Sequence, residues 1–87
     1  MSTSATEITV HAHDVVVTDA ELTVSLTDGR TISVPLVWFP RLVDGSPDQR
    51  ARWELLGDGD GIHWPDLDED LSVAGLLRGT RAPKRKR

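Results

Sequence analysis

Acidic side chains gather between residues 58 and 70, and hard cations such as calcium bind carboxylate oxygens at set spacing. The run Asp58-Gly59-Asp60-Gly61-Ile62 provides two ligands of a calcium loop but not the third. Glu69 stands where the closing ligand would be, but Pro65 interrupts the loop. We therefore expect no calcium site. We interpret Asp68-Glu69-Asp70 as negative charge at the N-terminus of a helix, where the helix dipole favours it.

The histidines His11, His13 and His63 are candidate zinc ligands. His11 and His13 would point to one side of a strand, but a structural zinc site needs four ligands and this chain has no cysteine. We expect no metal and no other cofactor. An enzyme would need a deep pocket that holds His63 beside an acid with a perturbed pKa.

Other catalytic motifs are missing from the sequence. With no cysteine and no serine in a G-x-S-x-G turn, the usual nucleophiles are absent. No glycine-rich phosphate loop joins a strand to a helix. We therefore expect a protein that is not an enzyme.

The aromatic residues are three tryptophans and one phenylalanine. In so short a chain they either close the core or form an exposed patch that binds another protein. Interface hot spots combine tryptophan with arginine, and here Arg41 lies close to Trp38 and Arg50 lies close to Trp53. The candidate partner-binding residues are Trp38, Arg41, Arg50, Trp53, His63, Trp64, Asp66 and Asp68.

The charges are divided unequally along the chain. Residues 1–77 carry four arginines and fourteen acids, a net charge of −10, whereas residues 78–87 carry +6. The acidic part would attract a cationic partner and repel nucleic acid, and the tail would do the reverse. The candidate nucleic-acid-binding residues are Arg81, Lys84, Arg85, Lys86 and Arg87.

The spacing of apolar residues predicts the strands that must position these side chains. Val15-Val16-Val17 is expected in a first strand within residues 8–17. Residues 21–26 and 31–36 alternate apolar and polar side chains with period 2, which indicates half-buried antiparallel strands. Pro35 cannot donate to a ladder, so the third strand is expected at an edge of the sheet.

The register of this hairpin can be predicted, because directly opposed residues share a face of the sheet. The apolar positions are all even-numbered, so the loop must have an odd length. A loop of Thr27-Asp28-Gly29 pairs Val24 with Ile32 and Leu22 with Val34, and it requires a positive φ at Gly29. The four apolar residues would then face the tryptophan-rich second half of the chain.

The second half predicts short helices and a second hairpin. After a helical turn at residues 38–42, Ser46-Pro47-Asp48-Gln49 has the features of a capping box that starts a helix ending near residue 53 or 54. Residues 54–56 and 62–64 are expected to pair about a glycine-rich turn. Ser72 or Asp70 would cap a last helix over residues 73–77, which Gly79 would end.

At 87 residues the chain is expected to form one α+β domain, with a small antiparallel sheet, two or three short helices and a second short β segment. The domain would span residues 8–79, between disordered residues 1–7 and a basic disordered tail at residues 80–87. No membrane span or signal peptide is evident. We expect a cytoplasmic monomer or homodimer.

The sequence resembles a bacterial family named domain of unknown function 2442 over residues 14–77. The family often has Ala-Thr where Gly45-Ser46 stand here, and the basic tail is not part of its pattern. The resemblance rests on the strand pair at residues 22–36 and on Trp38-Phe39-Pro40-Arg41-Leu42, Gln49-Arg50, Trp53, Gly61-Ile62-His63-Trp64-Pro65, Leu67-Asp68-Glu69-Asp70-Leu71-Ser72-Val73 and Gly75-Leu76-Leu77.

The resemblance implies a small α+β domain and brings no catalytic residues. Some members carry a following helix-turn-helix domain, and stand-alone members are described as antitoxins paired with a small neighbouring protein. The resulting hypothesis is a non-enzymatic protein-binding module, the antitoxin of a two-gene toxin–antitoxin pair. The alternative is a nucleic-acid-associated regulator that acts through its basic tail.

Overall fold

The computed structural model describes residues 10–80, and its first sheet forms from the period-2 segments. Strands β1 (Ala12–Val17), β2 (Glu21–Leu26) and β3 (Thr31–Pro35) pair antiparallel in the order β1-β2-β3. Pro35 therefore lies on an edge strand, as predicted. The first strand begins at Ala12 and contains Val15, Val16 and Val17, as predicted, while residues 8 and 9 lie outside the described part.

The β2–β3 hairpin has the predicted register. Val24 opposes Ile32 and Leu22 opposes Val34. The amide of Leu26 donates to the carbonyl of Arg30, and Gly29 has a φ of 95°. The odd loop length thus keeps the apolar side chains of both strands on one face.

Two helices and a 3-10 turn cross from the first sheet to the second. The 3-10 turn η2 (Leu36–Trp38) leads into α1 (Pro40–Val43), and α2 (Pro47–Ala51) follows. Ser46 and Gln49 form the predicted capping box at the start of α2, with Pro47 at its first position. The helix ends earlier than predicted, because Arg52 leaves the helical conformation and the chain extends into the next strand.

The second sheet contains three strands where the sequence predicted two. Strands β4 (Glu54–Leu56), β5 (Gly61–Trp64) and β6 (Glu69–Ser72) pair antiparallel in the order β4-β5-β6. The predicted pairing of residues 54–56 with 62–64 is confirmed. The interpretation of Asp68-Glu69-Asp70 as a helix N-terminus was wrong, since Asp68 ends the β5–β6 turn with a φ of 54° and the two following acids begin β6.

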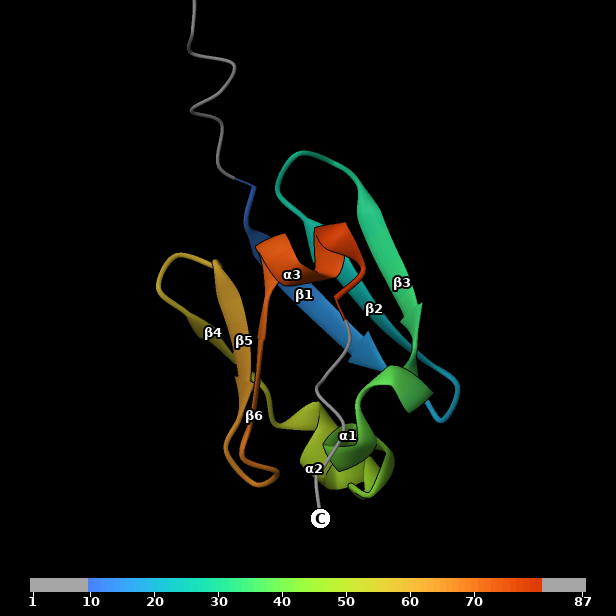
Figure 1. The fold of residues 1–87 in the computed structure, drawn as a ribbon. Coiled ribbons are helices and arrows are strands. Elements are labelled where there is room, and N and C mark those ends of the chain that lie inside the picture. Colours follow the sequence, from blue (N-terminus) through green and yellow to red (C-terminus); the bar gives the residue numbers. More distant parts are fainter. Residues whose placement is uncertain (1–9, 81–87) are drawn as a thin grey trace, which may run out of the picture.

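The last helix, α3 (Val73–Arg78), follows β6 directly. Ser72 is its N-cap, and the Ser72 hydroxyl accepts a hydrogen bond from the amide of Gly75 at 2.9 Å. Gly79 ends the helix in the left-handed conformation, as predicted. Figure 1 shows α3 in front of the first sheet, with α1 and α2 at the end of the molecule away from the β2–β3 turn.

The core lies between the two sheets and is closed by residues of η2, α1, α3 and the segments between them. The predicted inward residues Leu22, Val24 and Val34 are buried, and Ile32 is half-buried against them. In the described chain no helix has the length and apolar character that crossing a membrane requires. The buried apolar side chains are Ala12, Val15, Leu22, Val24, Leu26, Val34, Leu36, Phe39, Leu42, Ile62, Trp64, Val73 and Leu76.

Candidate functional site

The second sheet has one face toward the core and one face toward solvent. Ile62 and Trp64 of the middle strand are fully buried, so the side chains that alternate with them point outward. We call this exposed surface the outer face. It is formed by Glu54, Leu56, Gly61, His63, Asp70 and Ser72.

A histidine lies between two acids on the outer face. The ladder places Glu54 of β4 and Asp70 of β6 directly opposite His63 of β5, one on each side. The ring nitrogen Nδ1 of His63 donates a hydrogen bond to the Asp70 carboxylate. This bond, aided by the charges of Asp70, Glu54 and Asp68, raises the pKa of His63 above its ordinary value. The two acids beside His63 therefore favour the protonated, positively charged form of its ring.

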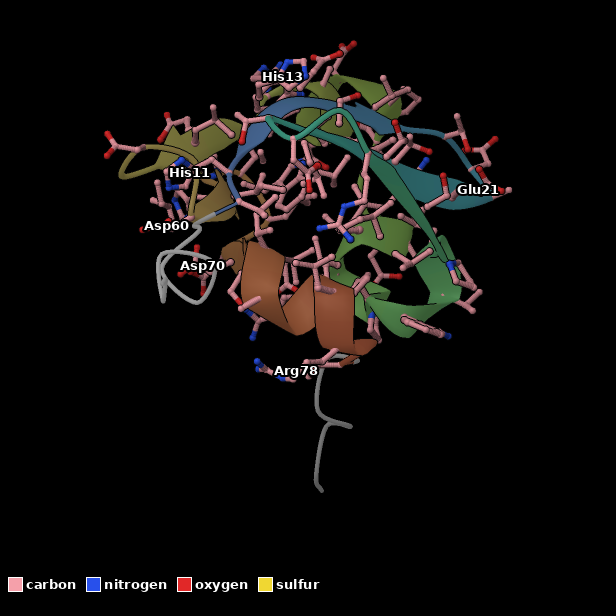
Figure 2. The ribbon with its side chains drawn as sticks, turned by 90° about the horizontal axis from the view of Figure 1, so that it is seen from above. His11, His13, Glu21, Asp60, Asp70 and Arg78 are labelled. Atoms are coloured by element: carbon pink, nitrogen blue, oxygen red, sulfur yellow. The ribbon has the colours of Figure 1, made fainter. Side chains whose placement is uncertain are left out.

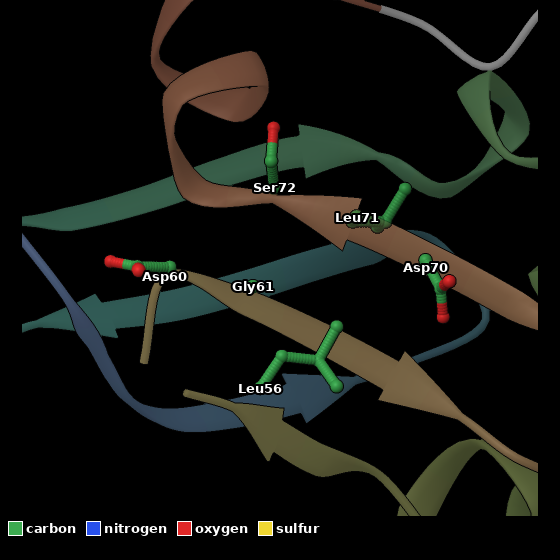
Figure 3. Close-up of a pocket in the computed structure, with 6 residues that line it drawn as sticks. All are labelled: Leu56, Asp60, Gly61, Asp70, Leu71 and Ser72. Atoms are coloured by element: carbon green, nitrogen blue, oxygen red, sulfur yellow. The ribbon is translucent and has the colours of Figure 1, made fainter. Parts of the chain in front are cut away.

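A hollow lies next to these three side chains. Leu56, Gly61 and Ser72 stand side by side on the three strands, and the side chain of Leu56 lies against Gly61, where an added Cβ would come within 3.4 Å of the Leu56 Cδ1. The hollow measures about 420 Å³, is open to solvent, and has Asp60 and Asp70 at its rim (Figure 3). Because the hollow is open, it would leave a small molecule largely exposed to solvent, unlike the enclosed pockets that bury most of a ligand.

The turn that precedes the hollow carries a further contact between an acid and a histidine. The His11 Nε2 lies 3.1 Å from a carboxylate oxygen of Asp60. Figure 2 shows Asp60 and Asp70 on the same side of the molecule, with His11 beside Asp60. Since Asp60 is largely exposed, it remains accessible to a partner despite its contact with His11.

The β5–β6 turn holds two of the predicted partner-binding acids. Asp66 accepts a hydrogen bond from Arg52, and the carbonyl and carboxylate of Asp68 accept from Arg41 of α1. These bonds connect the turn to the helical segment. Arg41, Asp66 and Asp68 are thus brought together on the surface, but their charges are partly satisfied within the chain.

Arg50 does not lie on an accessible surface, which corrects its assignment as a partner-binding residue. It is 7% exposed. Its guanidinium donates to the carbonyls of Leu42 and Val43 at 2.8 and 3.0 Å, and to Asp19 at 2.8 Å. These bonds hold the end of α1 against α2, so the role of Arg50 is structural.

The tryptophans divide between the core and the surface. Trp64 is fully buried, and its indole N–H donates to the carbonyl of Arg50 at 3.0 Å. Trp64 is therefore a core residue and not a contact for a partner. Trp38 and Trp53 are half-buried and pack against the core with part of each ring exposed.

Of the predicted residues, His63 is the one that belongs to the outer face. Sequence reasoning missed Asp70 and Ser72 because it did not recognise β6. It predicted the pairing of β4 with β5, but it did not ask which of Glu54, Leu56 and Gly61 share a face with His63. The alternation of Leu71 and Val73 about Ser72 is a strand signal that could have indicated β6. The predicted nucleic-acid-binding residues Arg81, Lys84, Arg85, Lys86 and Arg87 lie outside the described residues.

Metal and nucleophile chemistry find little support in the described residues. Within residues 10–80, no three histidine or acidic side chains are grouped so that they could hold a metal ion. His63 and Asp70 resemble part of a catalytic triad, but Ser72 nearby uses its hydroxyl to cap α3.

The comparisons with known proteins agree with the α+β fold. The family model described as protein of unknown function (DUF2442) matches residues 12–82. The chain belongs to this family. No curated protein is similar enough to match it.

Two solved structures are similar to this family member. A protein of unknown function from Rhodospirillum rubrum is 34% identical, with a TM-score of 0.74, and the match covers 88% of this chain and 95% of that one. The solution structure of the uncharacterized protein CV0863 from Chromobacterium violaceum is 23% identical, with a TM-score of 0.71 over 84% of this chain and 69% of that one. The second match supports the fold alone.

Proposed function

We propose that this member of the DUF2442 family is a non-enzymatic protein-binding module that receives a cationic partner on the outer face. The observation that carries the proposal is the open apolar hollow beside Leu56 and Gly61, with Asp60 and Asp70 at its rim. An apolar side chain of the partner would enter the hollow, while basic residues around it would meet the carboxylates.

The charge of the chain supports a cationic partner. Residues 1–77 carry a net charge of −10, so the field around them accelerates the approach of a positively charged protein. The rim acids Asp60 and Asp70 have side chains that are about 70% exposed, at 71% and 67%. Their accessibility allows contact at the moment of encounter.

The finer proposal is that the partner is the small toxin of a two-gene pair and that this chain is its antitoxin in the cytoplasm. A protein that acts on nucleic acid presents basic residues, and an acidic surface can cover them. The family resemblance supports the same assignment, because stand-alone relatives are described as antitoxins.

The experiment is co-expression with the protein encoded by the neighbouring gene, followed by co-purification at low salt. A stable complex is expected. Leu56→Ser should weaken its affinity by about tenfold or more, because it removes an apolar wall of the hollow. Leu77→Ser is the matched control, since Leu77 on α3 is 44% exposed and Leu56 is 41% exposed.

Two results would contradict the proposal at different levels. Clean separation of the two proteins at low salt would remove the antitoxin assignment. A complex that Leu56→Ser and Leu77→Ser weaken equally would place the binding surface elsewhere. Rescue of growth by the wild-type chain in cells that express the neighbouring protein would support the finer proposal.

A further inference from the structure

Strand β4 is the outer strand of the second sheet and has an open side. All three of its residues are exposed, and Leu55 and Leu56 are 37% and 41% exposed. On one side β4 pairs with β5. On the other side, no backbone hydrogen bond from another described segment reaches Leu55. Open edges with apolar side chains are sites of strand addition.

The direction of the backbone N–H and C=O groups determines which residues of β4 are free to pair with another strand. The carbonyl of Leu56 accepts from the amides of Gly59 and Asp60, which belong to the turn that leads to β5. It therefore points toward β5. Successive residues of a strand point their backbone groups to opposite sides, so the N–H and C=O of Leu55 point away from the sheet.

We propose that this edge pairs with the β4 of a second copy of the chain, in an antiparallel register centred on Leu55. Each Leu55 would then donate to and accept from the Leu55 of the other copy across a two-fold axis. The two sheets would join into one sheet of six strands, twice the three that each copy contributes. This proposal does not depend on the proposed function, since it requires only the chain itself.

The charges along β4 select this register. A shift that centres the pairing on Glu54 would place the two Glu54 carboxylates opposite each other. A shift centred on Leu56 would oppose Glu54 to Asp58. Like charges directly opposed destabilise strand pairs, whereas the register centred on Leu55 opposes Glu54 to Leu56.

The residues at the two ends of β4 are also complementary in charge. Arg52 precedes the strand and Asp58 follows it, and both are exposed, although Arg52 also forms an ion pair with Asp66 of its own chain. Antiparallel pairing brings the start of one β4 near the end of the other, so Arg52 of each copy approaches Asp58 of the other. Leu55 shares the core-facing side of the sheet with Ile62, and there it would pack against Leu55 of the second copy.

The pairing would be weak, because strands of three residues bury little surface. Stable interfaces bury about 1,200–2,000 Å² in total, and a smaller contact gives a dimer that dissociates on dilution. The net charge of −4 per chain opposes association further at low salt. We therefore expect the dimer at high protein concentration and at physiological salt.

Sedimentation of the full chain between about 10 μM and about 1 mM tests the proposal, because a weak interface dissociates within this range. The wild type should become increasingly dimeric with concentration, and the Leu55 amide should exchange more slowly. Leu55→Lys should raise the dissociation constant by about tenfold or more, because it opposes two ammonium groups. Leu55→Pro removes the outward N–H together with the leucine side chain, so it should act similarly.

Two controls keep the test specific. Leu77→Lys on α3 and Val16→Lys on β1, the outer strand of the other sheet, change residues that are 44% and 53% exposed. Both should dimerise like the wild type. A wild type that stays monomeric at every concentration overturns the proposal, and so does a dimer that Leu55→Lys leaves intact while Val16→Lys disrupts it. Circular dichroism confirms that each variant is folded.

Discussion

His63 shows how one side chain links the outer face to pH. Its pKa is raised mainly by the hydrogen bond to Asp70, so the folded protein holds the proton more tightly than the unfolded chain. The stability from this bond is fully present below about pH 6.5, the ordinary histidine value, and is lost as the pH rises through the raised pKa. We expect the melting temperature to fall across that interval.

The measurement is thermal unfolding between acid and mildly alkaline pH for the wild type and for His63→Gln. The variant should lose the part of the pH dependence that lies above pH 6.5. His13→Gln, at an exposed position on β1, should keep it. Burial raises the pKa of Glu69 as well, but all three proteins keep this residue, so it does not account for a difference between them. Identical pH profiles for the wild type and His63→Gln would contradict the assignment.

Arg50 is the residue whose removal should be most damaging among the arginines of the described chain. Arg50→Ala would leave the carbonyls of Leu42 and Val43 without their donors, which should lower the free energy of unfolding by about 2–4 kcal/mol. The bond to Asp19 contributes less, because the Asp19 side chain is 96% exposed. Urea denaturation measures the change. The exposed Arg52→Ala is the control and should change stability by under about 1 kcal/mol.

At the scale of elements, two hairpin turns use glycine for different reasons. Gly29 needs its positive φ, but an added Cβ would meet nothing within 4 Å. Gly59 has a φ of 109°, and an added Cβ would lie 2.4 Å from the carbonyl oxygen of Ala12. The amide of Ala12 donates to the carbonyl of Gly59, so this turn connects the two sheets.

The two turns should therefore respond differently to alanine. Gly29→Ala should lower the free energy of unfolding by about 1 kcal/mol, the strain of a left-handed residue. Gly59→Ala should lower it by about 2–4 kcal/mol, since the clash also displaces the start of β1. Denaturant unfolding of both variants measures the difference. Equal losses would mean that the contact between the sheets contributes little.

Some of the elements could be predicted from the sequence and others could not. The β2–β3 register was predictable because parity excludes a two-residue loop and Gly29 suits the three-residue turn, and the capping box at Ser46 has a local mechanism. Strand β6 was not predictable in the same way, because its acids equally suit a helix N-terminus. The burial of Arg50 was not visible either, since it depends on carbonyls that only the packing of α1 against α2 brings near. Consequently one residue of the outer face, His63, was found beforehand.

At the scale of the whole molecule, the division of charge separates the two functions that the sequence allows. Deleting residues 81–87 removes five positive charges and changes the net charge from −4 to −9. We expect the truncated chain to keep its complex with the neighbouring protein, because the outer face is unchanged. We expect it to lose retention on a short DNA duplex, because the acidic remainder repels phosphate.

The salt dependence of DNA binding tests the role of the tail. If the tail binds phosphates, the affinity of the full chain for DNA should fall steeply with salt, with a slope of about −0.9 for each phosphate neutralised and at most five phosphates for the five cations. Mobility-shift titrations at several salt concentrations give the slope. Unchanged DNA binding after deletion would exclude the tail as the contact. Loss of the protein complex on deletion would show that partner recognition requires the tail as well as the outer face.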